Sequence, residues 1–293
     1  MKRKFSIYYI ILSILFFCVG CSNDKPTVSK ISSTVLPVSS TIPSKTALVK
    51  EDKKTEVNAA KTAPLTKREG GIPVLMYHSI GFEKDNPVRL PVKNLEKQMK
   101  YLKDNNYTTL SLDEVYDYFQ NNKPIPEKSI VLTFDDGYLD NYTKLYAVMK
   151  KYEFKGTIFV ITKAINNEKD YLTSKQLKEL ENNNLSIESH TACHENLSEL
   201  SYDKQLKTLK NSKEFLEKTL NKKVKYIAYP YGKYNKDTLK AVKEAGYVMA
   251  FTTDGKWSDK SDGILTLDRV YVSGFFDMDT FINRVTNPNY EYN

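Results

Sequence analysis

The segment Ile130-Val-Leu-Thr-Phe-Asp-Asp-Gly137 decides how this chain of 293 residues is interpreted. Its first five residues predict a buried strand, and two adjacent carboxylates follow where that strand ends. Buried carboxylates are costly unless they are paired or bind a metal ion, and Gly137 lets the chain turn sharply after them. A helix N-cap with a turn would use the same Asp-Asp-Gly sequence, so both interpretations stay open at this point.

Strand and helix patterns alternate on both sides of this segment. Further strands are predicted at 72–78, 157–161, 185–189, 224–229, 247–251 and 270–272. Helices are predicted around 95–102, 111–118, 145–152, 173–180, 201–220 and 235–246, and Ser111, Thr173 and Asn235 are candidate N-caps. Repeated βα units of this length predict a parallel sheet, either a barrel or a doubly wound sheet.

Polar residues gather where the predicted strands end. They are His78, Asp135, Asp136, His190, Pro230 and Tyr231. A (β/α) barrel brings all such positions to one face, where its active site lies. No glycine-rich phosphate loop follows any of the strands, which argues against a nucleotide-binding doubly wound domain. We therefore expect an α/β fold, a distorted (β/α) barrel that forms a single catalytic domain over residues 70–293.

The N-terminus has the pattern of a bacterial export signal. Residues 1–4 are basic, and residues 5–19 form an apolar run too short for a comfortable membrane span. Gly20-Cys21 resembles a lipobox, whose cysteine is diacylated, although Cys18 replaces the usual leucine. We expect a signal peptide over 1–21 and an exported lipoprotein anchored through Cys21 to the outer face of the cytoplasmic membrane. An uncleaved signal anchor and an ordinary secretory signal are the alternatives.

Composition limits the partners. Residues 22–69 are rich in Ser, Thr, Pro and Lys and lack glycine, which predicts a disordered tether. The net charge of +8 suits an anionic wall or membrane, whereas the scattered lysines and the lack of a recognition motif argue against nucleic acid. The 21 tyrosines suit sugar rings, unless they only reflect a coding bias. Three cysteines, two of them in the signal region, give no disulfide framework.

The chain has only three histidines, His78, His190 and His194. The pair in His190-Thr-Ala-Cys-His194 could lie on one face of a helical turn, a frequent arrangement of metal ligands. The metalloprotease signature is excluded because Thr191 stands where that signature needs glutamate. One aspartate with two histidines would form an open metal site, and the second aspartate would be free to act as a base on a bound water.

Together these motifs resemble the polysaccharide deacetylases of carbohydrate esterase family four, which share the NodB-homology domain. The first family motif, TFDDG, is intact at Thr133-Phe-Asp-Asp-Gly137, and the second, H-[ST]-x-x-H, is intact at His190-Thr-Ala-Cys-His194. The resemblance extends over about residues 72–281. The segment Pro73-Val-Leu-Met-Tyr-His-Ser79 resembles the first strand of the branch that deacetylates biofilm exopolysaccharides, where a histidine at the position of His78 is the acid.

Three family motifs are altered. The third, usually Arg-x-Pro-Tyr, is Ala228-Tyr-Pro-Tyr-Gly232 here, and Arg269 is a candidate for the missing arginine. The fourth is loosely matched by Thr253-Asp-Gly-Lys-Trp257, which contains the only tryptophan. The fifth, Leu-x-His, has no histidine in Leu265-Thr-Leu267, so His78 is the expected acid.

The resemblance implies metal-assisted hydrolysis of an N-acetyl group. Asp136, His190 and His194 would hold a divalent ion, expected to be Zn²⁺, that activates water. Asp135 would be the base and His78 the acid. The backbone N–H of Tyr231 would stabilise the oxyanion, and Pro230 and Trp257 would contact the substrate.

The expected partner is an acetylated polysaccharide of the cell wall or matrix, acted on by a monomer that releases acetate. One alternative is an O-acetyl esterase acting on a xylan-like polymer, since the same site chemistry serves both. Another is a catalytically weak lipoprotein that keeps the fold and binds wall or matrix, because the third motif has lost its arginine.

Overall fold

The structure is a computed structural model that describes residues 65–66 and 70–291. The predicted signal peptide, Cys21 and most of the predicted tether lie outside these residues. The last part of the tether differs from the prediction, because β1 (Leu65–Thr66) pairs antiparallel with β4 (Ile125–Pro126). No helix in the described part combines the length and the apolar character that a membrane span requires.

A parallel sheet forms the centre of the fold, as the apolar runs predict. Seven strands follow the order β10-β2-β5-β6-β7-β8-β9 with parallel neighbours throughout, and β3 pairs with the start of β5. The strands are β2 (Val74–Tyr77), β3 (Thr108–Thr109), β5 (Ser129–Phe134), β6 (Gly156–Val160), β7 (Leu185–Ser189), β8 (Tyr226–Ala228), β9 (Met249–Phe251) and β10 (Val270–Tyr271).

The two edges of this sheet approach each other through the segment that leads into β10. Leu267 donates its N–H to the carbonyl of Ala250 at 3.1 Å and accepts the N–H of Thr252 at 2.8 Å, so it extends the sheet beyond β9. Three residues later, β10 pairs with β2 at the other edge. The sheet is therefore a curled, incompletely regular barrel, which confirms the predicted distorted (β/α) barrel and single domain.

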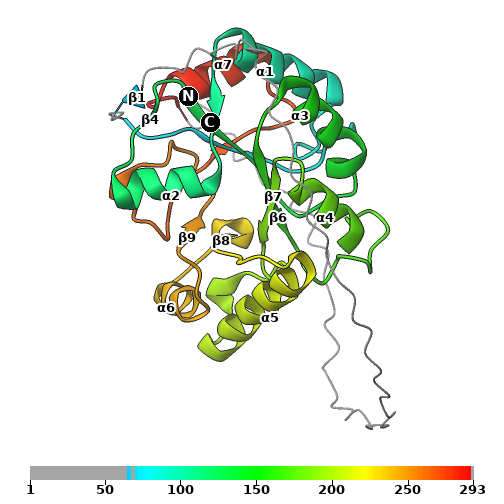
Figure 1. Ribbon diagram of the computed structural model, residues 1–293, viewed down its shortest axis with the longest axis vertical. Helices are drawn as coiled ribbons and strands as arrows, with labels where there is room; N and C mark the ends of the chain where they lie inside the picture. Colours follow the sequence, from blue (N-terminus) through cyan, green and yellow to red (C-terminus); the bar gives the residue numbers. More distant parts are fainter. Residues whose placement is uncertain (1–64, 67–69, 292–293) are drawn as a thin grey trace, which may run out of the picture. The chain divides into compact units, whose positions relative to one another are not determined.

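Helices pack around the strands (Figure 1). They are α1 (Val92–Asp104), α2 (Leu112–Asn121), α3 (Tyr146–Tyr152), α4 (Ser174–Glu181), α5 (Tyr202–Leu220), α6 (Lys236–Glu244) and α7 (Met278–Thr286). The predicted caps are confirmed, because Ser111, Thr173 and Asn235 each accept a backbone N–H at the first turn of α2, α4 and α6. A π-turn over Asn141–Leu145 precedes α3, and α7 has no counterpart among the predicted helices.

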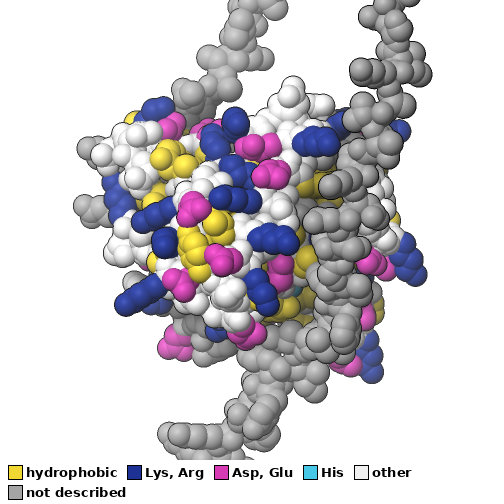
Figure 2. Space-filling view, turned by 90° about the horizontal axis from the view of Figure 1, so that it is seen from below, with side chains coloured by type: hydrophobic (Ala, Val, Ile, Leu, Met, Phe, Trp, Pro, Cys, Tyr) yellow, Lys and Arg dark blue, Asp and Glu magenta, His cyan; other side chains and the backbone are white. Residues whose placement is uncertain are grey.

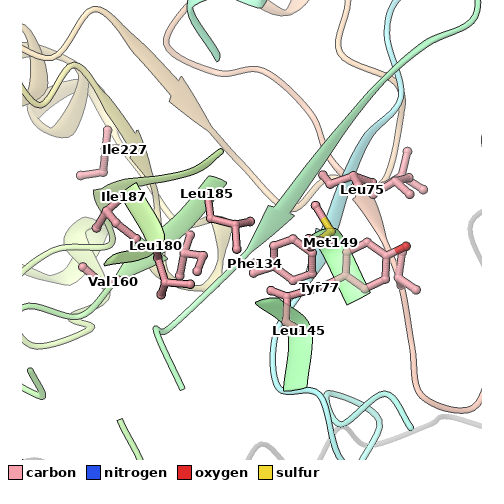
Figure 3. Close-up of a cluster of buried hydrophobic side chains, with 14 of the residues drawn as sticks. Leu75, Tyr77, Phe134, Leu145, Met149, Val160, Leu180, Leu185, Ile187 and Ile227 are labelled. Carbon is pink, nitrogen blue, oxygen red and sulfur yellow. The ribbon is translucent and has the colours of Figure 1, made fainter. Parts of the chain in front are cut away.

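Alternate side chains of the strands build two apolar layers. One face packs against the helices, as Figure 3 shows for Phe134, which lies near Leu145 and Met149, and for Ile187, which lies near Leu180. The other face fills the barrel, where Val131, Phe159 and their neighbours contact α2. The apolar filling ends at the carboxyl ends of the strands, where the polar residues of the candidate site lie.

The surface carries charge of both signs. Figure 2 shows lysine and arginine side chains interspersed with acidic side chains on the face in view. Mixed charges of this kind keep the surface hydrated. The face in view has no continuous basic patch of the kind that binds nucleic acid.

Candidate active site

The two adjacent carboxylates leave the end of β5 in opposite environments. Asp135 continues the strand, and its N–H donates to the carbonyl of Tyr77 at 2.9 Å. Asp136 then adopts a left-handed φ of 75°, followed by Gly137 at 82°. A Cβ on Gly137 would lie 2.8 Å from Cγ1 of Val160, so only glycine fits this turn. The turn directs the two consecutive side chains into the same buried site.

Asp135 is bound by Arg269 through two parallel hydrogen bonds. Nη1 and Nη2 of the arginine donate to the two carboxylate oxygens of Asp135, both at 2.7 Å. Arg269 is fully buried, and its Nε also donates to the carbonyl of Thr252 at 3.0 Å. Burial alone would raise the pKa of Asp135, but the charge and hydrogen bonds of Arg269, together with the nearby imidazoles, outweigh burial and hold that pKa well below its usual value. The fold thus brings the arginine that directly precedes β10 onto the carboxylate that the family's third motif would otherwise orient.

The histidine pair lies on an irregular turn, and the helical turn considered from its spacing is wrong. Thr191 and His194 both have left-handed φ values, 65° and 57°. Glu195 holds the turn by accepting hydrogen bonds from the Thr191 hydroxyl at 2.8 Å and the Cys193 N–H at 3.1 Å. The two imidazoles still meet, with ring centroids 4.9 Å apart.

Hydrogen bonds orient both imidazoles. Nδ1 of His190 lies 2.8 Å from the carbonyl oxygen of Ala228, and Nδ1 of His194 lies 3.1 Å from the hydroxyl of Tyr231. Their Nε2 atoms therefore face Asp136, at 3.5 Å and 3.4 Å from its Oδ1. A histidine that binds a metal ion through one ring nitrogen usually forms a hydrogen bond through the other, which fixes the orientation of the ring.

The arrangement fits a divalent metal ion. Asp136, His190 and His194 each offer a ligand atom, all within 4.8 Å of one another. Oδ1 of Asp136 is buried and has no hydrogen-bond partner in the described part of the chain. A buried carboxylate oxygen without a partner is costly unless a cation binds it. Two imidazoles and one carboxylate are a donor set that suits Zn²⁺ with open positions.

The protonation of these groups follows from their burial. Burial and the neighbouring negative charge of Asp135 raise the pKa of Asp136 to about 6. Burial lowers the pKa of His190 to about 3 and that of His194 to about 4. At neutral pH all three side chains are therefore in the state that binds a cation.

His78 reaches the same site from the end of β2. Its Nδ1 is buried without a hydrogen-bond partner among the described residues, and its ring packs edge-on against Tyr271 at 6.3 Å. Asp140 and Asn141 hold the segment that carries it. Asn141 donates to the carbonyl of His78 at 3.1 Å, and Asp140 accepts the N–H of Ile80 at 3.0 Å. A backbone held in this way fixes where the imidazole can reach.

The altered third motif contributes Pro230 and Tyr231 beside the histidines. Both lie in a short 3-10 turn, where Tyr231 has a left-handed φ of 59°. Pro230 is buried, whereas Tyr231 is 40% exposed and packs edge-on against His194 at 4.6 Å. Gly232 fits closely beneath them, since a Cβ there would lie 2.7 Å from the backbone N of Thr253.

Trp257 does not join the site. Its side chain is buried and its Nε1 donates to the carbonyl of Arg284 at 2.8 Å. It lies beside Gly71, ahead of the amino end of β2, whereas the site lies at the carboxyl ends of the strands. The predicted substrate contact of Trp257 is therefore corrected to a role in the apolar core.

Several residues at the site were not predicted from the sequence. Glu195 shapes the histidine turn, Asp140 and Asn141 hold the His78 segment, and Tyr138 hydrogen-bonds Asp136. Their nearness in sequence to the motifs is the one signal that could have found them.

Comparison with known proteins agrees with these motifs. A family model described as polysaccharide deacetylase matches residues 122–250. The chain is 41% identical over 208 residues to the putative polysaccharide deacetylase YxkH of Bacillus subtilis, covering 71% of this chain and 74% of that protein. It is 31% identical over 191 residues to the poly-β-1,6-N-acetyl-D-glucosamine N-deacetylase of Staphylococcus aureus, covering 61% of this chain and 66% of that protein.

Solved structures extend the similarity to the fold. The deacetylase PplD of Streptococcus pyogenes, solved in complex with acetate, superposes with a TM-score of 0.70 at 33% identity, covering 73% of this chain and 98% of that chain. The putative polysaccharide deacetylase BA0330 of Bacillus anthracis gives a TM-score of 0.66 at 32% identity, covering 74% and 69%.

Proposed function

Because the chain belongs to the polysaccharide deacetylase family of carbohydrate esterases, we propose that it is a metal-dependent hydrolase that removes N-acetyl groups from an N-acetylglucosamine polymer. The observation that carries this proposal is the cluster of Asp136, His190 and His194 around an unpartnered, buried carboxylate oxygen. Asp135 lies beside it at 4.0 Å from Nε2 of His190 and is ready to act as a base.

Each residue has a distinct role in this proposal. Asp136, His190 and His194 would hold the ion, which supplies charge that polarises the acetyl carbonyl and activates water. Asp135, kept ionised by Arg269, takes the proton of the attacking water. The N–H of Tyr231 faces the oxyanion, as the family resemblance implies.

His78 completes the reaction as the acid. An amine leaves poorly as an anion, so a proton must reach its nitrogen as the C–N bond breaks. His78 enters the site from β2, on the other side of β5 from the histidines that follow β7. Its position allows it to protonate the sugar nitrogen while Asp135 acts on the water, giving acetate and a glucosamine unit.

The relatives support an N-acetyl polymer as the substrate. The Staphylococcus aureus relative is named for poly-β-1,6-N-acetyl-D-glucosamine, and PplD was solved with acetate. The bidentate contact of Arg269 with Asp135 also supports an active enzyme, because the missing third-motif arginine was the reason to consider a catalytically weak protein.

Acetate release by the full chain tests the proposal. The substrates are acetylated β-1,6-linked glucosamine oligomers, chito-oligomers, peptidoglycan and acetylated xylan, each tried with and without a chelator. We expect release from an N-acetyl polymer, loss with the chelator and recovery with Zn²⁺. Release from xylan alone would identify an O-acetyl esterase. Binding of a glycan without release would identify a non-catalytic wall or matrix protein.

We also propose that the enzyme acts at the outer face of the cytoplasmic membrane, anchored through a diacylated Cys21. The basic start, the apolar run and Gly20-Cys21 support this placement. Metabolic labelling with a fatty acid should mark the wild-type chain and not a Cys21→Ala variant. An unchanged label in that variant would exclude this anchor.

A further inference from the structure

Exposed aromatic side chains gather on the loops that follow the strands at the site. Among the described residues, the exposed large apolar side chains are Phe82 (80%), Phe275 (62%), Tyr231 (40%), Val248 (37%) and Tyr234 (36%). All four aromatic residues follow the carboxyl ends of β2, β8 or β10, the edge where the site lies. Only Val248, which precedes β9, lies at the other end of the strands.

Phe82 and Phe275 belong to two loops that are fastened together. The N–H of Gly274 donates to the carbonyl of Pro87 at 2.7 Å, and the hydroxyl of Ser273 lies 3.4 Å from the same oxygen. The approach is close, since a Cβ on Gly274 would lie 2.2 Å from the carbonyl oxygen of Arg89. The two loops that carry the exposed rings are therefore held against each other rather than being independent.

These two loops continue directly from the site. Phe82 follows His78 by four residues, and Phe275 follows Tyr271 by four. The rings of His78 and Tyr271 pack edge-on, and Tyr271 packs in the same way on Phe276 at 6.1 Å. A polymer whose reacting unit lies against His78 would extend its neighbouring units over Phe82 and Phe275.

The charges around the two rings favour a sugar chain over a membrane. Exposed Glu83 and Asp85 follow Phe82 on either side of exposed Lys84, and Glu83 pairs with Arg89 at 2.8 Å. Exposed Asp277 and Asp279 follow Phe275 with no basic residue between them, so acidic side chains predominate beside the two rings. Aromatic residues that insert into an anionic membrane are usually accompanied by lysine or arginine. Acidic neighbours instead suit a polymer that carries free amines once it has been deacetylated.

We propose that Phe82 and Phe275 form a stacking platform for the sugar units next to the reacting one, so that the enzyme prefers long, partly deacetylated chains. The proposal rests on the proposed deacetylase function. Sugar rings present apolar C–H faces that pack against aromatic rings, as other apolar groups do. The platform would raise affinity for a polymer without contacting the acetyl group itself.

The test compares substrates of different length in the full chain. For wild type, Phe82→Ala/Phe275→Ala and Val248→Ala, kcat/KM is measured on an acetylated monosaccharide and a pentasaccharide. Loss of each ring should lower the ratio of kcat/KM for the pentasaccharide to that for the monosaccharide by about 2- to 10-fold. The double variant should therefore lower this ratio by about 4- to 100-fold, mainly through a higher KM for the pentasaccharide. Val248→Ala, exposed at the far end, should keep the wild-type ratio.

Binding measurements keep this proposal separate from the proposed activity. Calorimetric titration of the pentasaccharide should show weaker binding by the double variant even if no glycan releases acetate, in which case the deacetylase proposal alone fails. Equal pentasaccharide binding and an unchanged length ratio would overturn the platform. Loss of binding to phosphatidylglycerol vesicles with an unchanged ratio would also overturn it and assign the two rings to a membrane.

Discussion

Glu188 and Asp136 are both buried acidic residues, and they differ in how completely they are partnered. Glu188, in β7, accepts from Nζ of Lys222 at 3.1 Å and from the backbone N–H groups of Lys225 and Tyr226 at 3.0 Å and 2.9 Å. Asp136, after β5, is buried as well, but its Oδ1 has no partner in the described part of the chain.

The difference separates a structural carboxylate from a functional one. A buried charge with all its hydrogen bonds made ties elements together and has nothing left to bind. A buried carboxylate oxygen aimed at two imidazole nitrogens is costly until a cation arrives. Asp135 is intermediate, because Arg269 satisfies its charge while leaving it beside His190.

The largest expected effect is on turnover. Asp135→Asn keeps the shape of the side chain but cannot take a proton, and His78→Ala removes the proposed acid. Each should lower kcat by about 10²–10⁴-fold on the best acetylated glycan. The bound metal, measured in the same samples, should stay at the wild-type level because neither residue is a ligand. A folded, metal-loaded His78→Ala variant with wild-type turnover would reduce His78 to a packing residue.

The pair of Asp135 and Arg269 should be the most sensitive point for stability. Arg269→Met leaves a buried carboxylate unpaired and should lower the free energy of unfolding by about 3–5 kcal/mol. Arg269→Lys keeps the charge but loses the second hydrogen bond, so it should recover only part of the loss. Urea denaturation of wild type and both variants gives their free energies of unfolding. Equal values for Arg269→Met and wild type would show that the ion pair does not stabilise the fold.

The structural pair of Glu188 and Lys222 gives a smaller and different effect. Glu188→Gln should lower the free energy of unfolding by about 1–3 kcal/mol, because the partners of the carboxylate lose charge-assisted hydrogen bonds. Metal affinity and kcat should not change. A large drop in the metal content of Glu188→Gln would show that Glu188, like Asp136, contributes to metal binding.

On metal binding, the three ligand side chains should together release one proton at acidic pH and none at neutral pH. The pKa of Asp136 is raised to about 6, whereas those of His190 and His194 are lowered to about 3 and 4. Between about pH 4.5 and 6 the group that must lose a proton is therefore Asp136, and affinity should fall about tenfold per pH unit below pH 6. Calorimetry in buffers of different ionisation enthalpy counts the protons. Release of two protons at pH 5 would mean that a histidine is also charged.

Much of the fold could be predicted because local signals agree with it. Capping residues such as Ser111 and Thr173 mark helix starts, and β7 has the predicted bounds Leu185–Ser189. The motifs also locate Asp136 and the histidines, since the carboxyl ends of parallel strands meet at one edge.

Other features depend on contacts that no local pattern contains. Arg269 and Asp135 are 134 residues apart, so their pairing could only be guessed from a missing arginine. The left-handed turn at Thr191 is fixed by Glu195, and a spacing of four residues suggested a helical turn instead. Motif similarity predicts a substrate contact for Trp257, but the fold buries this side chain beside Gly71, at the other end of the barrel.

The most direct test of the account is the metal content of three full-length proteins after equilibration with Zn²⁺. We predict about one ion per chain in the wild type and in Glu188→Gln. Asp136→Asn should lose affinity by more than the ~10–100-fold typical of removing an outer partner of a ligand. Equal metal content in Asp136→Asn and wild type, or a wild type that binds no divalent ion, would contradict the central claim that the unpartnered carboxylate marks a metal site.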